Sequence, residues 1–122
     1  MTVITGVRTV TVPVTDQEQA LRFYVDTLGF TVLRDGPIPT GRWIELSPGG
    51  DNDGVVITLD KAPENVARGP IMIRFTTDDA AAAHAALTGA GVDTDEVLTW
   101  PGVPPMFAFR DPDGNTFSIT ET

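Results

Sequence analysis

The chain has 122 residues, of which 41% are hydrophobic, and carries a formal net charge of −9 from 8 Lys and Arg against 17 Asp and Glu. This length suits one globular domain with a single core. The acidic balance and the lack of a basic cluster argue against nucleic acid as a partner. The chain has no cysteine, which excludes disulfides, thiolate metal sites and thiol nucleophiles.

No apolar run approaches the roughly 20 residues that a membrane-spanning helix needs. The N-terminal stretch "MTVITGVRTV" lacks the charged start and the continuous apolar segment of a signal peptide. We therefore expect a soluble protein of the cytoplasm with no membrane partner.

The first half of the chain predicts a strand, a helix and three further strands. Residues 8–16 ("RTVTVPVTD") alternate as a strand, and 17–28 ("QEQALRFYVDTL") place apolar residues at helical spacing. Asp16 is the expected N-cap of this helix, and Gly29 is a plausible left-handed residue at its end. The expected strands that follow are 30–34, 42–47 and 55–60.

The second half repeats this order. Residues 71–78 ("IMIRFTTD") alternate, an alanine-rich helix follows in "DAAAAHAALTGA", and Gly91 ends it. From Asp16 to Gly29 is thirteen positions, as is the span from Asp78, the expected second N-cap, to Gly91. The expected later strands are 96–99, 106–110 and 115–120, the last two joined by a "DPDGN" turn. We predict one domain, 1–122, of two βαβββ modules (about 1–62 and 69–122) with a polar link between them.

The segments "VTVPVTDQEQALRFYVDTLGF", "IEL" and "FRDPDGNTFSI", in this order and on a duplicated frame, resemble the vicinal oxygen chelate superfamily. That superfamily includes glyoxalase I, bleomycin resistance proteins, fosfomycin resistance enzymes and extradiol dioxygenases. The resemblance implies an α+β fold in which two βαβββ modules form a half-open eight-stranded barrel around a cavity. It also implies a homodimer, with the cavity completed within one chain or between chains.

Metal-using members of the superfamily hold one divalent ion with four inward-pointing His and Glu side chains. By the resemblance, these four positions fall on Thr9, Glu45, Met72 and Ser118, so only one carries a usual ligand. The single histidine, His84, lies in the middle of the second helix, where we expect a packing or surface role. We therefore predict no cofactor, and a divalent metal is disfavoured.

Strand alternation predicts which residues line the cavity beside these positions. If Thr9 and Glu45 point inward, their strands also present Thr11 and Trp43, and the strand of Met72 presents Arg74. The valines at 10, 12 and 14 then pack beneath the helices. Glu45 and Arg74 can form a structural ion pair at the barrel mouth, or a recognition or acid/base site in which Glu45 is the base.

Aromatic residues give the predicted cavity an apolar part. Trp43, Trp100 and Phe107 fall on or next to strands that border it, and the proline-bearing "TWPGVPP" segment can cover its mouth. Trp100 can instead fill a gap beneath that segment. The net charge favours cationic ligands mildly. The Asp-rich stretches "GGDNDG" and "DPDG" read as hairpin turns rather than calcium loops.

The predicted function is therefore binding of a small organic molecule, of the sequestering or resistance type. The alternative is an enzyme of the lyase, isomerase or dioxygenase class. That enzyme would work without a metal through Glu45 and Arg74, or with a metal held by a non-standard ligand set.

Overall fold

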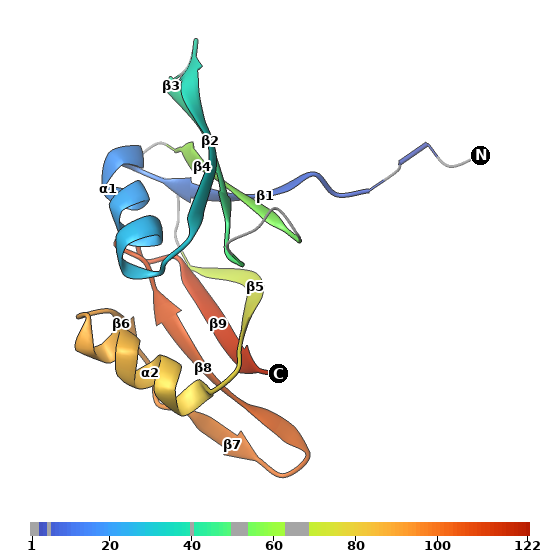
Figure 1. Cartoon of the computed structure of the whole chain (residues 1–122), viewed down its shortest axis with the longest axis vertical. Coiled ribbons are helices and arrows are strands. Elements are labelled where there is room, and N and C mark those ends of the chain that lie inside the picture. Colours follow the sequence, from blue (N-terminus) through green and yellow to red (C-terminus); the bar gives the residue numbers. More distant parts are fainter. Residues whose placement is uncertain (1–2, 5, 40, 50–53, 63–68) are drawn as a thin grey trace. The chain divides into compact units, whose positions relative to one another are not determined.

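The computed structural model describes residues 3–4, 6–39, 41–49, 54–62 and 69–122. The chain divides into two compact units, Met1–Glu64 and Asn65–Thr122. Each unit contains one sheet and one helical segment (Figure 1). The turn predicted at 49–54 and the link predicted after Lys61 fall largely outside the described residues.

The first unit follows the predicted order of strand, helix and three strands. It consists of β1 (Thr9–Val14), α1 (Gln17–Leu21), the π-helix η1 (Arg22–Thr27), β2 (Thr31–Ile38), β3 (Gly41–Ser47) and β4 (Val56–Lys61). The sheet order is β1-β4-β3-β2, with β1 and β4 parallel and the remaining pairs antiparallel. β1 and β4 can pair in parallel because the long connection between them, which includes the helical segment, returns the chain to the end of the sheet where β1 begins.

One face of this sheet packs against the helical segment. The fully buried side chains on that side include Val12, Val14, Ile44, Leu46 and Leu59, with Ala20 and Tyr24 from the helical segment. They alternate along each strand with residues of the opposite face, as a half-buried sheet requires. The predicted burial of the first strand's valines is confirmed at positions 12 and 14, and Val10 is half-buried.

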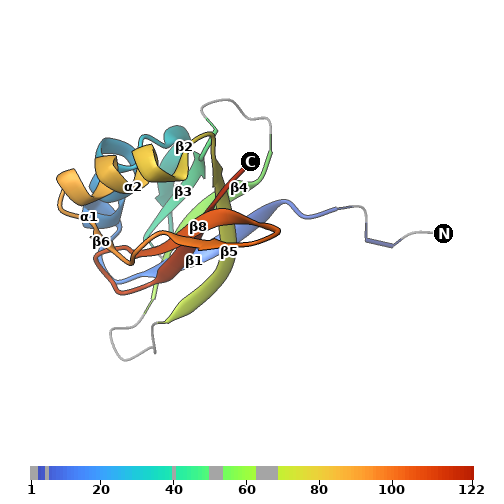
Figure 2. The ribbon, with the colours of Figure 1, turned by 90° about the horizontal axis from the view of Figure 1, so that it is seen from below.

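The second unit contains β5 (Pro70–Thr77), α2 (Ala80–Gly89), β6 (Asp93–Thr94), β7 (Leu98–Trp100), β8 (Val103–Arg110) and β9 (Thr116–Glu121). Its sheet order is β5-β9-β8-β6, and β7 pairs with β8. Phe107, Phe109 and Phe117 are buried on the side of α2. In each unit the helix lies along one face of its own sheet (Figure 2).

The two helical segments begin alike but differ by one residue. Asp16 caps the first, as predicted, and accepts a hydrogen bond from the Gln19 amide at 3.0 Å. The second is capped by Asp79 and not by Asp78, because it is the Asp79 carboxylate that accepts from the Ala82 amide at 3.0 Å.

Counted from these caps, the first helical segment spans one more position than the second. Gly29 and Gly91 both have positive φ, 81° and 84°, as the predicted left-handed ends require. Asp16 lies thirteen positions before Gly29, whereas Asp79 lies twelve before Gly91. The π-helix accommodates the extra residue through the hydrogen bond of the Leu28 amide to the Phe23 carbonyl, 3.0 Å, five residues back.

The predicted strand 96–99 is wrong in its position. Pairing instead occurs at Asp93–Thr94 and at Leu98–Trp100. The proline-bearing segment is a tight hairpin, in which Trp100 pairs with Val103 and Gly102 adopts φ 77° at the third turn position. Pro followed by a positive-φ Gly is the sequence of a type II turn.

The closing hairpin is confirmed, although β8 begins three residues before the predicted strand and β9 begins and ends one residue later. β8 and β9 pair antiparallel, and Gly114 adopts φ 85° in the turn between them. Glu121 is the last residue of β9, and its carboxylate accepts a 2.9 Å hydrogen bond from the Ala80 amide. The chain's end therefore helps to cap α2.

The helices of the described residues are too short and too polar to cross a lipid bilayer.

Candidate functional site

A polar face lies on the first sheet, opposite the helical segment. The strand register sets Thr11 beside Thr58 and Thr58 beside Glu45 across β1, β4 and β3. The Thr11 and Thr58 hydroxyl oxygens are 3.0 Å apart. Thr9 and Trp43 share this face by strand alternation. We call these five residues the polar face, and four of them are among the predicted lining residues.

Glu45 is the charged centre of the polar face. It is only 6% exposed, and its Oε2 accepts hydrogen bonds from Trp43 Nε1 at 2.8 Å and from Arg8 Nη2 at 3.1 Å. The Trp43 indole, against the opposing effect of burial, and the charges of Arg8 and Arg34 hold the pKa of Glu45 below its usual range. Glu45 is thus an ionised, fixed carboxylate whose Oε1 has no hydrogen bond to the described residues.

The cation that pairs with Glu45 was not the one expected from the sequence. The structure gives it Arg8, whose side chain is 73% exposed, whereas we expected Arg74. Arg8 immediately precedes β1, so strict strand alternation from Thr9 would turn it to the other face. Because Arg8 lies outside the paired strand, its long side chain is free to reach back to Oε2.

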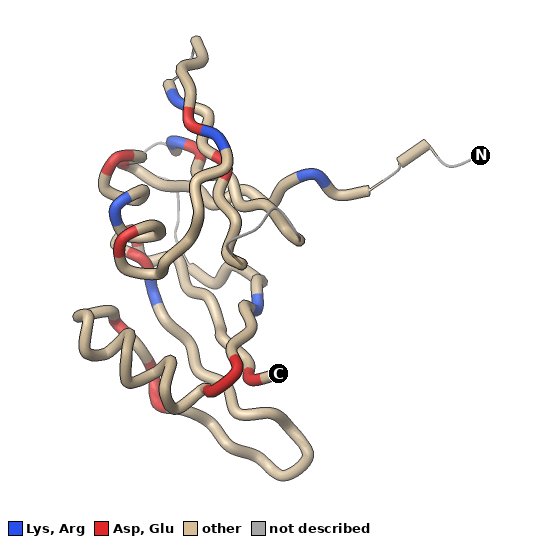
Figure 3. Tube along the Cα trace, viewed as in Figure 1, with Lys and Arg blue, Asp and Glu red and all other residues tan. Residues whose placement is uncertain are grey.

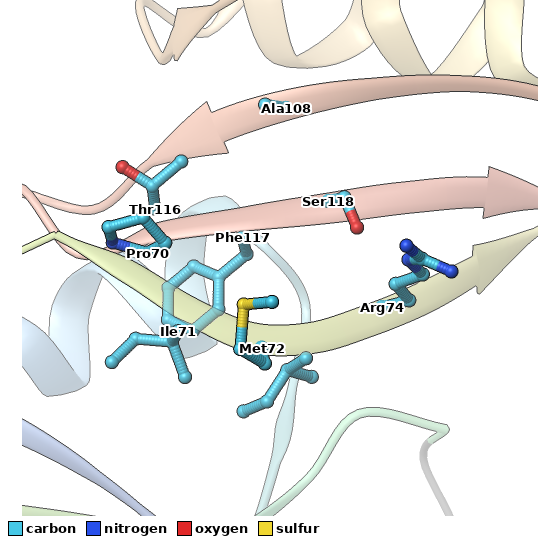
Figure 4. A pocket seen from close by; sticks show the side chains of 9 residues that line it. Pro70, Ile71, Met72, Arg74, Ala108, Thr116, Phe117 and Ser118 are labelled. Carbon is cyan, nitrogen blue, oxygen red and sulfur yellow. The ribbon is translucent and has the colours of Figure 1, made fainter.

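The second sheet bears an open groove of about 470 Å³ on its face opposite α2. Residues from β5, β8 and β9 line it: Pro70, Ile71, Met72, Ile73, Arg74, Ala108, Thr116, Phe117 and Ser118 (Figure 4). Met72, predicted to line a cavity, is 94% exposed in this groove. Three of the predicted lining residues, Met72, Arg74 and Ser118, therefore meet within a single unit.

Polar groups in and beside this groove lack protein partners. Arg74 and Ser118 are register neighbours on β5 and β9, and their side chains lie side by side (Figure 4). Neither side chain forms a hydrogen bond or ion pair within the described part of the chain. Two residues further along β9, the buried Thr120 hydroxyl also has no partner among the described residues. The groove therefore presents a cation and a hydroxyl available to a ligand.

Two predicted lining residues lie elsewhere. Phe107 is 2% exposed and packs edge-on against the His84 ring, 5.1 Å between centroids, on the α2 side of the sheet. It pairs with Ile119, one residue out of phase with Ser118, so it lies on the face opposite the groove, and its ligand-binding role stays a prediction. Trp100 is 59% exposed at the β7–β8 hairpin and is not among the groove residues, so it fills no gap.

His84 has the packing role that we expected. Its Nε2 is 2.9 Å from the Asp95 carbonyl oxygen, which ties α2 to the segment before β7.

The residues at the superfamily's metal positions do not fit a His and Glu site. Met72 lies seven residues before the Asp79 cap, as Thr9 does before the Asp16 cap. The two residues therefore occupy equivalent positions in the two halves, and neither is a usual metal ligand. Ser118 offers a neutral hydroxyl, and Glu45 is held by Arg8 and Trp43. Within the described residues no three His, Cys, Asp or Glu side chains converge. The absence of a cofactor stays a prediction.

A family model for the Glyoxalase/Bleomycin resistance protein/Dioxygenase superfamily matches residues 6–119. The chain therefore belongs to this superfamily, as the motifs predicted. Among curated proteins, a glyoxylase-like domain-containing protein of Didymella fabae is 33% identical over 115 residues, which cover 88% of this chain and 87% of that protein.

Solved structures extend the likeness to the whole chain. TnmS3, an antibiotic binding protein from Streptomyces sp. CB03234, is 32% identical with a TM-score of 0.82, covering 99% of this chain and 98% of its own. A superfamily member from Sphaerobacter thermophilus DSM 20745 is 31% identical with a TM-score of 0.85 and covers 98% of both chains. The predicted α+β fold class of two βαβββ modules is confirmed.

Proposed function

We propose that this chain is a small-molecule-binding protein of the sequestering or resistance type. The observation that carries the proposal is its full-length likeness to TnmS3, an antibiotic binding protein. Fold alone does not set function in this superfamily, so the residues of the site must support the same conclusion.

The groove of the second unit supports this function. Its volume of about 470 Å³ falls in the range of small-molecule sites, and apolar residues surround a few polar ones. Arg74 and Ser118 can orient a ligand because the described residues leave them without partners. The groove residues that repeat the superfamily's metal positions, Met72 and Ser118, are suited to contact rather than to coordination.

The proposal includes a homodimer that acts in the cytoplasm without a metal. Exposed apolar side chains support association of two copies, because exposed apolar patches often mark interfaces. The most exposed of the large apolar side chains are Val3, Ile4, Val7 and Met72. Light scattering coupled to size-exclusion chromatography tests the dimer, and a mass of one chain at micromolar concentration would contradict it.

A second candidate function is catalysis with Glu45 as general base, and a specific observation favours it. Oε2 is fixed by Arg8 and Trp43 while Oε1 has no bond to the described residues. An ionised carboxylate with one free oxygen can accept a proton from a bound substrate. The lowered pKa of Glu45 makes it a weak base, and for this reason we prefer ligand binding to catalysis as the function.

The test is a titration of purified protein with a panel of planar aromatic compounds and peptide antibiotics, bleomycin included, measured by isothermal titration calorimetry. Saturable binding with the compound recovered unchanged by mass spectrometry is the expected result. A product formed by wild type but not by Glu45→Gln would establish the enzyme instead. No saturable binding across the panel would contradict the proposed function.

A further inference from the structure

Building on the proposed function, we infer that the groove of the second unit selects organic anions. The ligand class is an apolar, ring-sized body that bears a carboxylate or another oxyanion, and Arg74 is the residue that binds this group. The net charge of the whole chain predicts the opposite preference, for cations. The inference therefore depends on how the charges are distributed.

Four described arginines have an ion pair and Arg74 has none; Arg34 also has none, but its charge lies near that of Glu45. Carboxylate oxygens lie 3.1 Å from Arg8, 3.7 Å from Arg22, 2.6 Å from Arg42 and 2.7 Å from Arg110. Arg74 has no such partner within the described residues, although the chain has 17 Asp and Glu against 8 Lys and Arg; Figure 3 marks them along the trace. In an acidic chain, an arginine without a carboxylate is a cation available to an external anion.

Acidic side chains of the second unit have other partners. Asp95 binds Arg110 through both carboxylate oxygens, at 2.7 and 3.0 Å. Asp79 and Glu121 accept from the first amides of α2, at 3.0 and 2.9 Å. Asp111 accepts from the Asn115 amide in the β8–β9 turn at 2.9 Å. These four carboxylates are therefore engaged by groups other than Arg74, and Asp78 and Glu96 form no ion pair with Arg74.

The groove has the shape and chemistry for both parts of such a ligand. Arg74 and Ser118 stand next to each other at one end, where a planar guanidinium and a hydroxyl can donate to the same oxyanion (Figure 4). Met72 and Ile71 lie further along and offer an apolar surface to the ligand's body, over the buried Phe117 ring. A cation would find no carboxylate among the groove residues.

The polar face of the first unit does not favour a cation either. Its carboxylate, Glu45, already binds Arg8 and Trp43. Arg34 lies close enough to lower the pKa of Glu45 as well, so two cations accompany one anion there.

The experiment uses three probes that share one naphthalene ring system and differ in charge: 2-naphthoate, the neutral 2-naphthamide and the cationic 2-naphthylmethylammonium ion. Each is titrated into ¹⁵N-labelled full-length protein at low salt, and amide shifts report both affinity and location. We expect 2-naphthoate to bind at least about tenfold more tightly than the amide, as a charge-assisted hydrogen bond allows, with shifts in β5 and β9.

Variants assign this preference to one side chain. Arg74→Gln should remove the tenfold advantage, and Arg74→Lys should keep most of it. The matched control is Arg22→Gln, which changes the net charge equally on an exposed helix position and should leave the preference intact. Ser118→Ala should weaken naphthoate binding several-fold, about the effect of one lost hydrogen bond.

The outcomes separate this inference from the proposed function. Equal binding of all three probes, or a naphthoate preference that survives in Arg74→Gln, would overturn the anion site and leave small-molecule binding standing. Binding of none of the probes would also overturn it, and the broader panel of compounds would then decide the proposed function independently. Loss of the preference in Arg22→Gln would show a general charge effect and count against Arg74.

Discussion

The two units of this chain share one frame but use the helix-free faces of their sheets differently. In the first unit, Glu45 is 6% exposed and bonded to Arg8 and Trp43, and the Thr11 and Thr58 hydroxyls bond each other. In the second unit, Met72 is 94% exposed and its neighbour Arg74 has no partner among the described residues. The polar groups of the first face mostly bond one another, with Glu45 Oε1 as an exception, whereas Arg74 and Ser118 on the second face have no partner among the described residues.

The helix-facing sides show no such difference. Tyr24, Leu46 and Leu59 in the first unit and Phe107, Phe109 and Phe117 in the second are all at most 2% exposed. Folding requires this side to be apolar and close-packed in both units. The opposite face is less constrained by folding, and ligand recognition can therefore differ there.

The largest expected effect tests the likeness of the helix-facing sides. Phe117→Ala should lower the free energy of unfolding by about 3–5 kcal/mol, and Leu59→Ala by about 2–5 kcal/mol, because each leaves a cavity in a buried core. Urea unfolding followed by circular dichroism measures both. A loss below about 1 kcal/mol in one unit alone would show that the two cores are not equivalent.

The next effect concerns the satisfied polar face. Glu45→Ala should lower the free energy of unfolding by about 1–3 kcal/mol, because Trp43 and Arg8 lose their shared acceptor in a largely buried place. Glu45→Gln keeps an acceptor oxygen and should cost less. If both variants are as stable as the wild type, the Glu45 contacts contribute nothing to folding and the contrast between the faces fails.

The pH dependence of the Tm also tests the contribution of the Glu45 contacts to stability. The folded state holds the pKa of Glu45 below its ordinary value of 4.5, so the stabilisation is complete above that value. It is lost as the pH falls through the folded pKa. The Tm of the wild type should therefore fall more steeply below pH 4.5 than the Tm of Glu45→Gln. Asp35 and Asp95, whose pKa values are also lowered by Arg42 and Arg110, are present in both proteins and cancel. Parallel Tm curves would contradict this assignment.

A smaller effect is expected at the surface ion pairs, where the units again agree. Asp35 binds Arg42 through both oxygens in the first unit, as Asp95 binds Arg110 in the second. Asp35→Asn and Asp95→Asn should each cost about 0.2–1 kcal/mol, since solvent screens exposed pairs. The cost should shrink in about 1 M NaCl, and a salt-independent loss would point to packing instead.

The smallest effect separates a satisfied hydroxyl from an available one. Ser118→Ala should change the free energy of unfolding by less than about 0.5 kcal/mol, because Ser118 has no hydrogen bond to the described residues. Thr58→Ala is the matched variant in the first unit and should cost about 1 kcal/mol, because its hydroxyl bonds that of Thr11. Equal losses would show that the Ser118 hydroxyl is engaged in the free protein.

The fold was largely predictable because alternation, helix caps and glycines repeat in both halves. Asp16, Gly29 and Gly91 mark helix ends by chemistry that acts over a few residues. The second cap was misplaced because Asp78 and Asp79 are adjacent and either can serve as an N-cap. The strand near Leu98 was misplaced because the hairpin turn after Trp100 determines its register.

The site was predictable only where strand parity decides it. Parity placed Glu45 on the same face as Thr11, and it turned Arg74 and Ser118 inward; the register of β5 against β9, which the sequence does not show, makes these two neighbours. The register of β8 against β9 places Phe107 on the face opposite Ser118; Phe107 had been predicted as a lining residue for its aromatic character alone. Parity could not find Arg8, because the reach of a long side chain at a strand end follows no period.

The one-residue surplus in the first helical segment bears on how the two halves are related. The cap at Asp16 and the glycine at its end keep their local geometry, so the extra residue is absorbed between them in η1. Removing one residue within Arg22–Thr27 should yield an ordinary α-helix with both flanking strands in their present registers. The π-helix therefore holds the one-residue difference in length between the two helical segments, while the cap and the terminal glycine keep the same local geometry in both units.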